Sequence, residues 1–322
     1  MKNITRYLLL IPFVLLWVSS SGFAQDTGVL ILAHGGSEEW NDAVIEAAEP
    51  LKEKYKVEVA FGMANYVSMY HGIKALEKQK VSTIAVVPLF ISSHSLIIRQ
   101  TEYLLGKRDT LDERPMPLMH HADEYKKMMG IEDNSGHSSH SSGGHHFYTP
   151  ENLQPLPVKA DVAIGPALDD HPVVADILSR RIQELSSNPA NETVLLVAHG
   201  PNEESDNRGW VRTMESLSKK IQTLQEEKGD PYKQIFSLTV RDDAPEPIFE
   251  QAKAHLRTLV RQAGQNGEVI VVPLFLSSGG REHAVAERLE GLDFAWNGRT
   301  LLPDSTITEF LWQSAEQALG EK

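Results

Sequence analysis

The sequence predicts an α/β protein of two tandem, doubly wound domains, each built on a parallel sheet and related by internal duplication. Four apolar runs rich in β-branched residues are typical of strands buried on both faces. Stretches with helical spacing of apolar residues separate these runs, which gives the strand–helix alternation of doubly wound sheets. The runs also resemble one another in pairs, as expected of a repeat.

The composition excludes several functions. The chain has 322 residues, enough for two ordinary domains, and 41% of them are hydrophobic, as in globular proteins. The net charge of -13 provides no basic surface, so we expect no nucleic-acid partner. There is no cysteine, so any metal must be bound by histidine, carboxylate or main-chain groups.

The first two dozen residues are typical of a secretory signal. Lys2 and Arg6 precede an apolar run over 7–18, and small residues lead to Ala24. The run is shorter than the roughly 20 residues of a membrane-spanning helix. We expect cleavage after residues 1–24, a periplasmic or otherwise exported soluble chain, and membrane contact only through this segment. An uncleaved anchor is the alternative.

The internal repeat consists of two pairs of segments in the same order. Gly28–Gly36 matches Thr193–Pro201, and Ile84–Ser93 matches Val269–Ser278. Two ordered matches of about ten residues indicate duplication. They place the first domain at 28–187 and the second domain at 192–322.

Helical spacing connects the repeated strands. It predicts helices over 42–55 and 210–224, and a further helix over 172–185 that Asp169 or Asp170 would cap.

The domains are predicted to close in the same way. A strand over 162–167 and the helix over 172–185 close the first domain, whereas a strand over 299–302 and a helix over 307–319 close the second.

An insertion over about 106–157 interrupts the first domain. We expect a loop with one helix near 120–129. Its centre carries four histidines spaced by serine and glycine, namely His137, His140, His145 and His146. Such a cluster can bind transition metals loosely and raise their local concentration, and a solvating polar linker is the alternative.

Four further histidines follow the repeated strands. His34 and His199 come directly after one strand of each domain, and His94 and His283 come after the other. Ligands bind outside the carboxyl ends of parallel strands, so each domain should bring two histidines to one cleft. Imidazole is a ligand for divalent metals and a proton acceptor near neutral pH. A loop-capping hydrogen bond is the alternative for any one of them.

These segments resemble the class II chelatases, the family of sirohydrochlorin cobaltochelatases and ferrochelatases. The resemblance rests on the strand that ends in His-Gly, on the strand Val-Val-Pro-Leu-Phe-Leu-Ser-Ser-Gly-Gly followed by His, and on 165–172. It implies a chelatase-like fold, with His34 and His94 holding the metal and helping to deprotonate the macrocycle. It also implies a sirohydrochlorin-like tetrapyrrole and a divalent metal (Co²⁺, Fe²⁺ or Ni²⁺) as substrates, with no further cofactor.

The sequence departs from the family pattern at the second strand of each repeat. Gly62–Ala64 stands where the family has an acidic residue, whereas Asp242 and Asp243 lie near the equivalent place in the second domain. We nevertheless expect the first domain to be the active one. His34-Gly35-Gly36 matches the family more closely than the second copy, which has Pro201.

An acidic protein that binds a polycarboxylate substrate needs local positive charge. Arg99 and Arg281 are the candidates, because arginine binds carboxylates in a bidentate manner. The predicted function is insertion of Co²⁺ or Fe²⁺ into a sirohydrochlorin-type ring. An exported, non-catalytic protein that binds metal or tetrapyrrole is the alternative.

Overall fold

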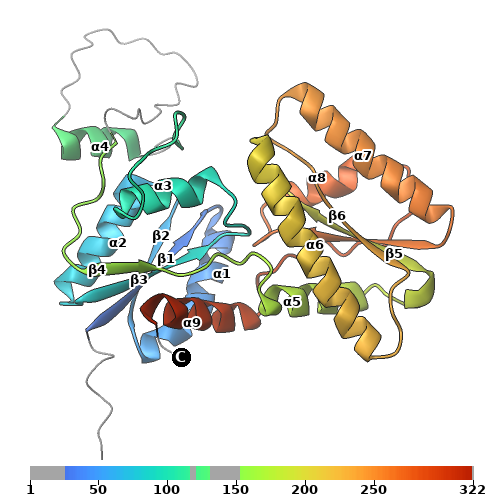
Figure 1. Ribbon diagram of the computed structural model, residues 1–322, viewed down its shortest axis with the longest axis horizontal. Coiled ribbons are helices and arrows are strands. Elements are labelled where there is room, and N and C mark those ends of the chain that lie inside the picture. Colours follow the sequence, from blue (N-terminus) through green and yellow to red (C-terminus); the bar gives the residue numbers. More distant parts are fainter. Residues whose placement is uncertain (1–25, 117–120, 131–152, 321–322) are drawn as a thin grey trace, which may run out of the picture.

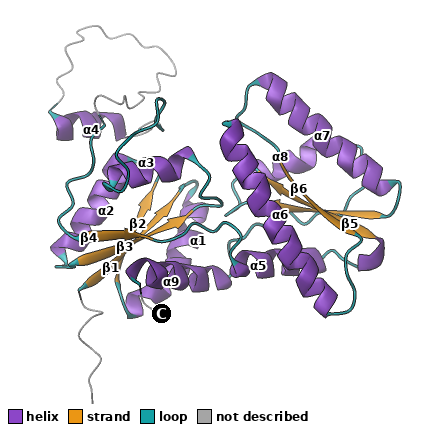
Figure 2. Ribbon diagram, in the orientation of Figure 1, coloured by secondary structure: helices purple, strands orange, loops and turns teal. Residues whose placement is uncertain are grey.

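The computed structural model describes residues 26–116, 121–130 and 153–320 and contains two parallel sheets with helices on both faces (Figures 1 and 2). The first sheet has the strand order β2-β1-β3-β4 and the second β6-β5-β7. Their strands are β1 (Thr27–Ala33), β2 (Lys56–Phe61), β3 (Thr83–Leu89), β4 (Asp161–Ile164), β5 (Glu192–Ala198), β6 (Gln234–Thr239) and β7 (Glu268–Leu274). All pairs are parallel, which confirms the predicted fold class.

The two sheets repeat one local arrangement. In each sheet, the first strand along the chain lies between the second and the third. Pro88 pairs with Leu32 in the first sheet, and Pro273 pairs with Val197 in the second. This is the arrangement that an internal repeat predicts, and common descent of the two halves stays a prediction.

Most helices agree with the sequence periodicity. The predicted helix over 42–55 is α1 (Glu38–Ala48) followed by a 3-10 turn, and it begins earlier because Ser37 Oγ caps the amide of Trp40. The helix over 210–224 lies within α6 (Glu204–Glu227), and the helix in the insertion is α4 (Ala122–Met129). The remaining helices around the sheets are α2 (Tyr66–Lys78), α3 (Leu96–Leu104), α7 (Glu246–Gly264) and α8 (Arg281–Arg288).

The cap of α5 (Pro172–Gln183) differs from the prediction. His171 Nδ1 accepts from the amide of Val173 at 3.3 Å, so the N-cap is the histidine. Asp169 instead accepts from the amide of Ser93 at 2.8 Å, and Asp170 accepts from Lys220 at 2.7 Å. Both aspartates are therefore occupied by other parts of the fold.

The two closing helices are exchanged between the sheets. α5 packs against α6 and β7, whereas α9 (Thr306–Leu319) packs against β3 and α1. Thr308 Oγ1 donates to Ala47 O at 2.9 Å, and Ser314 Oγ donates to Pro166 O at 3.0 Å. The prediction that the C-terminal helix closes the second domain is therefore wrong, because the apolar face of a helix does not specify which sheet buries it. One core cluster draws residues from both sheets, so packing crosses the predicted boundary between 187 and 192.

The predicted strand over 299–302 is also absent from the part of the chain that the structure describes. A single parallel bridge, Ile270↔Ala295, takes its place beside β7. Leu301 N then donates to Phe275 O at 2.9 Å, so the chain follows the sheet without forming a strand.

No helix in the described ranges is both long and apolar enough to cross a membrane. The predicted signal segment over 1–24 and the histidines of the insertion, His137, His140, His145 and His146, lie outside the described residues.

Candidate functional site

The loops at the carboxyl ends of the two sheets meet between the halves. The segment after β3 contacts the start of α6, because Trp210 Nε1 donates to His94 O at 2.8 Å. A side chain at Gly279, after β7, would lie 3.7 Å from the ring of Trp40 in α1. Three of the predicted histidines, His34, His94 and His199, therefore lie in loops at the carboxyl ends of the strands, where ligands bind in open parallel sheets.

His34 follows β1 at a tight turn. Its Nδ1 lies 2.7 Å from Gly35 O, and its ring centroid lies 6.4 Å from that of Trp40. Gly35 has φ of +79°, and a Cβ there would stand 3.0 Å from Phe61 Cβ, so the turn favours glycine. Because a carbonyl oxygen only accepts, Nδ1 carries the proton in the neutral ring. Nε2 of His34 then retains its lone pair, as a metal ligand requires.

His199 follows β5 at the equivalent turn, but its second nitrogen has a carboxylate partner. Nδ1 lies 2.5 Å from Gly200 O, and Nε2 lies 3.0 Å from Asp243 Oδ2. Both ring nitrogens thus face oxygen acceptors, which only the protonated imidazolium satisfies fully. The surroundings of His199 suit a histidine that takes up a proton.

Asp243 is held as a carboxylate. The hydrogen bond with His199 lowers its pKa most, burial opposes this, and the charges of His199 and Arg281 lower it further, so the pKa is well below its ordinary value. Arg281 Nη1 lies 3.2 Å from Asp243 Oδ1. An ionised partner orients the imidazole and stabilises its positive charge.

The structure distinguishes the two neighbouring aspartates. Asp242 turns inward to Arg288, and Asp243 turns to the histidine. They diverge after Arg241, which has a left-handed φ of 53°. The sequence contained both acids but had no signal for which one faces the edge of the sheet.

His94 lies in the loop between β3 and α3. Its amide donates to Ser92 Oγ at 3.2 Å, and its ring lies against Gly209 of the second half. His283 lies in the first turn of α8, with its side chain 73% exposed and Nε2 3.8 Å from the buried Glu282. The Arg281-Glu282 pair moves His283 into the helix, and no contact joins it to His199 among the described residues.

The two arginines predicted to bind substrate differ in their surroundings. Arg99 donates from Nε to Asp112 at 2.7 Å, and from Nη1 and Nη2 to Asp206 at 2.8 and 3.1 Å. Burial alone would lower the pKa of Arg99, but these two carboxylates outweigh it and raise the pKa. The guanidinium of Arg99 is already bound by these two carboxylates of the protein. Arg99 therefore joins α3 to α6 and is not available to bind a carboxylate of the substrate. Arg281 is half exposed beside Asp243.

The described ranges contain no group of three or more histidine, aspartate or glutamate side chains arranged to hold a metal ion. The four strand-end histidines, His34, His94, His199 and His283, are therefore not gathered around one point. Any metal bound here would have fewer protein ligands, with the remaining positions left to water or to the ring nitrogens of a tetrapyrrole.

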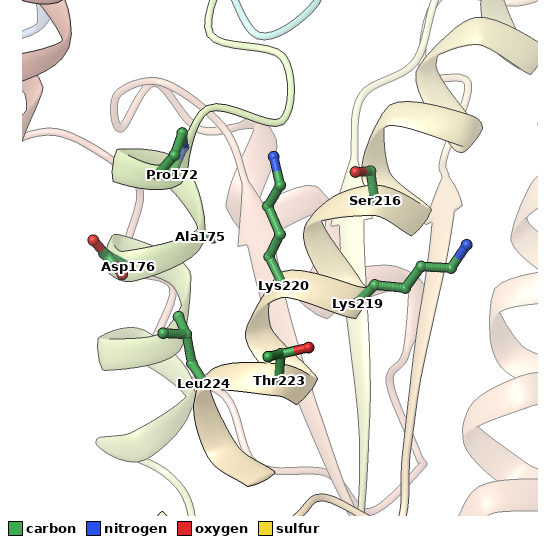
Figure 3. A pocket seen from close by; sticks show the side chains of 8 residues that line it. All are labelled: Pro172, Ala175, Asp176, Ser216, Lys219, Lys220, Thr223 and Leu224. Carbon is green, nitrogen blue, oxygen red and sulfur yellow. The ribbon is translucent and has the colours of Figure 1, made fainter. Parts of the chain in front are cut away.

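A pocket lies between α5 and α6 (Figure 3). Two of its lining residues, Ser216 and Lys220, donate to Asp170 at 2.6 and 2.7 Å. Its lining consists of Pro172, Ala175, Asp176, Ser216, Lys219, Lys220, Thr223 and Leu224. None of the predicted site residues lines it.

The fold and the facing strand-end loops define a two-halved α/β protein of the chelatase type. Residues 28–185 match the family model described as CbiX, so this part of the chain is similar to the CbiX family. No curated protein matches the chain in sequence.

Two solved structures share the fold. One is SirB from Bacillus subtilis with Fe³⁺, at 14% identity and a TM-score of 0.52, covering 91% of this chain and 96% of that one. The other is the sirohydrochlorin chelatase SirB from Bacillus subtilis subspecies spizizenii in complex with cobalt, also at 14% and 0.52, covering 92% and 96%.

Proposed function

We propose that the protein inserts a divalent metal, Co²⁺ or Fe²⁺, into a sirohydrochlorin-type tetrapyrrole. The CbiX family match supports this, as does the fold shared with SirB, whose structures hold Fe³⁺ and cobalt. The main structural support is that two histidines at equivalent strand ends, His34 and His199, have different hydrogen-bond partners. His34 has one ring nitrogen against a carbonyl oxygen, whereas His199 also has the carboxylate of Asp243 against its second ring nitrogen.

Metal insertion needs both properties. The metal must exchange water for ring nitrogens, and two pyrrole protons must leave the ring. We assign metal binding to His34 and His94. Proton uptake is assigned to neutral His199, which would accept the pyrrole proton on Nε2, and Asp243 would stabilise the imidazolium that forms. This shares the reaction between the halves and departs from the expectation that the first half alone is active, because the carboxylate partner lies in the second half.

Arg281 is the candidate for binding substrate carboxylates. It is half exposed, and its Nη1 lies beside Asp243 in the same loop region as His199. A guanidinium there can engage an acidic substituent of the ring while it still neutralises Asp243. Arg99 is omitted from this role, since Asp112 and Asp206 already engage it.

The test is anaerobic insertion by the purified mature protein. Sirohydrochlorin is mixed with Co²⁺, Fe²⁺ or Ni²⁺, and the macrocycle spectrum is followed with and without the protein. We expect faster insertion of Co²⁺ or Fe²⁺ than in the spontaneous reaction. An unchanged rate for all three metals contradicts the enzymatic proposal.

The alternative is an exported, non-catalytic protein that binds metal or tetrapyrrole. It is favoured by Gly62–Ala64, which lack the acidic side chain of the family, and by the exposed position of His283 in the first turn of α8. In the same experiment, this alternative predicts a shifted spectrum of bound sirohydrochlorin without conversion to the metallated ring.

Export is part of the proposal and has a separate test. The segment over 1–24 is expected to be removed after Ala24. The intact mass of the protein recovered from the periplasm of an expression host should then be that of a chain that begins at Gln25. A mass that retains Met1 would contradict cleavage.

A further inference from the structure

The loop that carries His94 is held by a helix from the other half of the molecule. The indole of Trp210 in α6 donates to His94 O at 2.8 Å. Trp210 is half-buried and lies 116 residues further along the chain. This hydrogen bond fixes the main chain of His94 relative to the second sheet.

Gly209, the neighbour of Trp210, makes room for the imidazole. A Cβ at this position would stand 2.3 Å from Cγ of His94 and 2.6 Å from its Nδ1. No left-handed φ explains the glycine, because Gly209 lies within α6 with helical backbone. Glycine weakens a helix interior relative to alanine. The close approach of the His94 ring is therefore what requires glycine here.

An ion pair fastens the same helix turn to the next turn of the His94 segment. Asp206 in α6 is almost fully buried, and both its oxygens accept from Arg99 in α3, at 2.8 and 3.1 Å. Bidentate pairs of this kind are specific in geometry as well as strong. Arg99 lies five residues after His94 in the chain. The Arg99–Asp206 ion pair therefore restrains how the segment that carries His94 packs against α6.

We propose that the first turns of α6, through Asp206, Gly209 and Trp210, position the imidazole of His94. The second half thereby sets the orientation of a metal-binding side chain that belongs to the first half. The three α6 residues are positioning residues, since they act through His94. The inference rests on the proposed function only for the role of His94 in metal binding.

The experiment compares Gly209→Ala with Glu215→Ala, an exposed site on the same helix. The imidazole of His94 is followed in the full-length mature chain by ¹H–¹⁵N NMR, with His94→Gln used to assign its signals. Gly209→Ala should shift these signals and raise the half-saturating metal concentration for insertion about 10- to 100-fold, with KM for the tetrapyrrole little changed. Glu215→Ala should leave the His94 signals and the half-saturating metal concentration unchanged.

Two further variants keep the test decisive if Gly209→Ala does not fold. Trp210→Phe keeps an aromatic side chain but loses the indole N–H donor. Asp206→Asn keeps the shape of the side chain but loses its charge. Each should also shift the His94 signals. Unshifted His94 signals in the folded variants overturn the inference, whatever happens to activity. If the wild-type protein does not accelerate insertion but the signals still shift, the proposed function fails and the positioning stands.

Discussion

Asp243 is the residue on which the chemistry of the site depends most. Its pKa is lowered chiefly by the hydrogen bond with His199, so it stays ionised wherever a histidine titrates. A carboxyl group whose pKa is lowered by folding stabilises the fold above its ordinary pKa of about 3.9. That contribution disappears as the pH falls through the lower pKa of the folded state.

Replacing the histidine should therefore change the titration of the aspartate. In His199→Gln, we expect the pKa of Asp243 to rise toward its ordinary value, because its largest stabilising partner is lost. Titration of the side-chain carboxyl ¹³C signal measures this directly. An unchanged titration curve would mean that Asp243 and His199 do not interact in solution. Asp176, an exposed carboxylate on α5, serves as the internal reference.

The turn after His199 requires glycine for two reasons. Gly200 has φ of +73°, and a Cβ there would lie 2.4 Å from Thr239 Cβ. Gly229 has a similar φ of +80°, but a Cβ there would have no neighbour within 4 Å among the described residues. Both alanine variants place a side chain in a left-handed conformation, which costs about 1–2 kcal/mol.

Gly200→Ala should lower the free energy of unfolding more than Gly229→Ala does. The excess should be about 1–3 kcal/mol, as for other overpacked positions, because only Gly200 meets a neighbouring strand. Urea unfolding of the two variants and the wild type measures the difference. Equal losses would show that Thr239 does not confine this turn.

Part of this residue-scale detail could be predicted from the sequence. His34 and His199 lie where the predicted strands end, because a strand of known direction fixes the residue that follows it. The choice between Asp242 and Asp243 could not be predicted. It depends on the left-handed backbone of Arg241, and on tertiary contacts with Arg288 that no local pattern records.

At the scale of elements, the exchange of α5 and α9 between the sheets is the main difference from the prediction. Both helices were predicted from the sequence, over 172–185 and 307–319. It could not identify their partners, since either sheet offers an apolar face. The sequence also did not distinguish a strand from a single bridge. Ala295 pairs with β7 through one bridge, and the described residues form no strand over 299–302.

Gly165 tests the position of α9. A Cβ at Gly165 would stand 2.4 Å from the main-chain oxygen of Ser314 in α9. Gly165→Ala should therefore loosen α9 and raise amide hydrogen exchange in α9 and β3, with β7 unaffected. Gly264→Ala is the control, because its nearest neighbour, a methyl of Val269, is 3.9 Å away. Faster exchange confined to the second sheet would contradict the exchanged arrangement.

At the scale of the whole molecule, the halves depend on each other. Their strand-end loops meet, one core cluster draws on both sheets, and α6 holds the loop of His94. The repeat in the sequence predicted two similar sheets. It did not predict that histidines from the two halves would have different partners, because the repeated motifs are nearly the same while the loops after β2 and β6 are not.

The histidines of the insertion offer a test of metal capture. Replacing His137, His140, His145 and His146 together by serine keeps the length of the segment and removes its imidazoles. If they raise the local metal concentration, the half-saturating metal concentration should rise severalfold with the maximal rate unchanged. Deletion of 137–146 should behave in the same way. A loss of maximal rate in the serine variant would instead place these side chains in the reaction.

The most direct test of the account is the insertion rate of paired variants under anaerobic, single-turnover conditions. His34→Ala and His94→Ala should weaken metal binding, whereas His199→Ala and Asp243→Asn should slow insertion about 10- to 100-fold at saturating metal. His255→Ala, an exposed histidine on α7, should match the wild type. Variants in both halves are expected to lose activity. Full activity after loss of His199 and Asp243, or after loss of His34 and His94, would contradict a reaction shared between the halves.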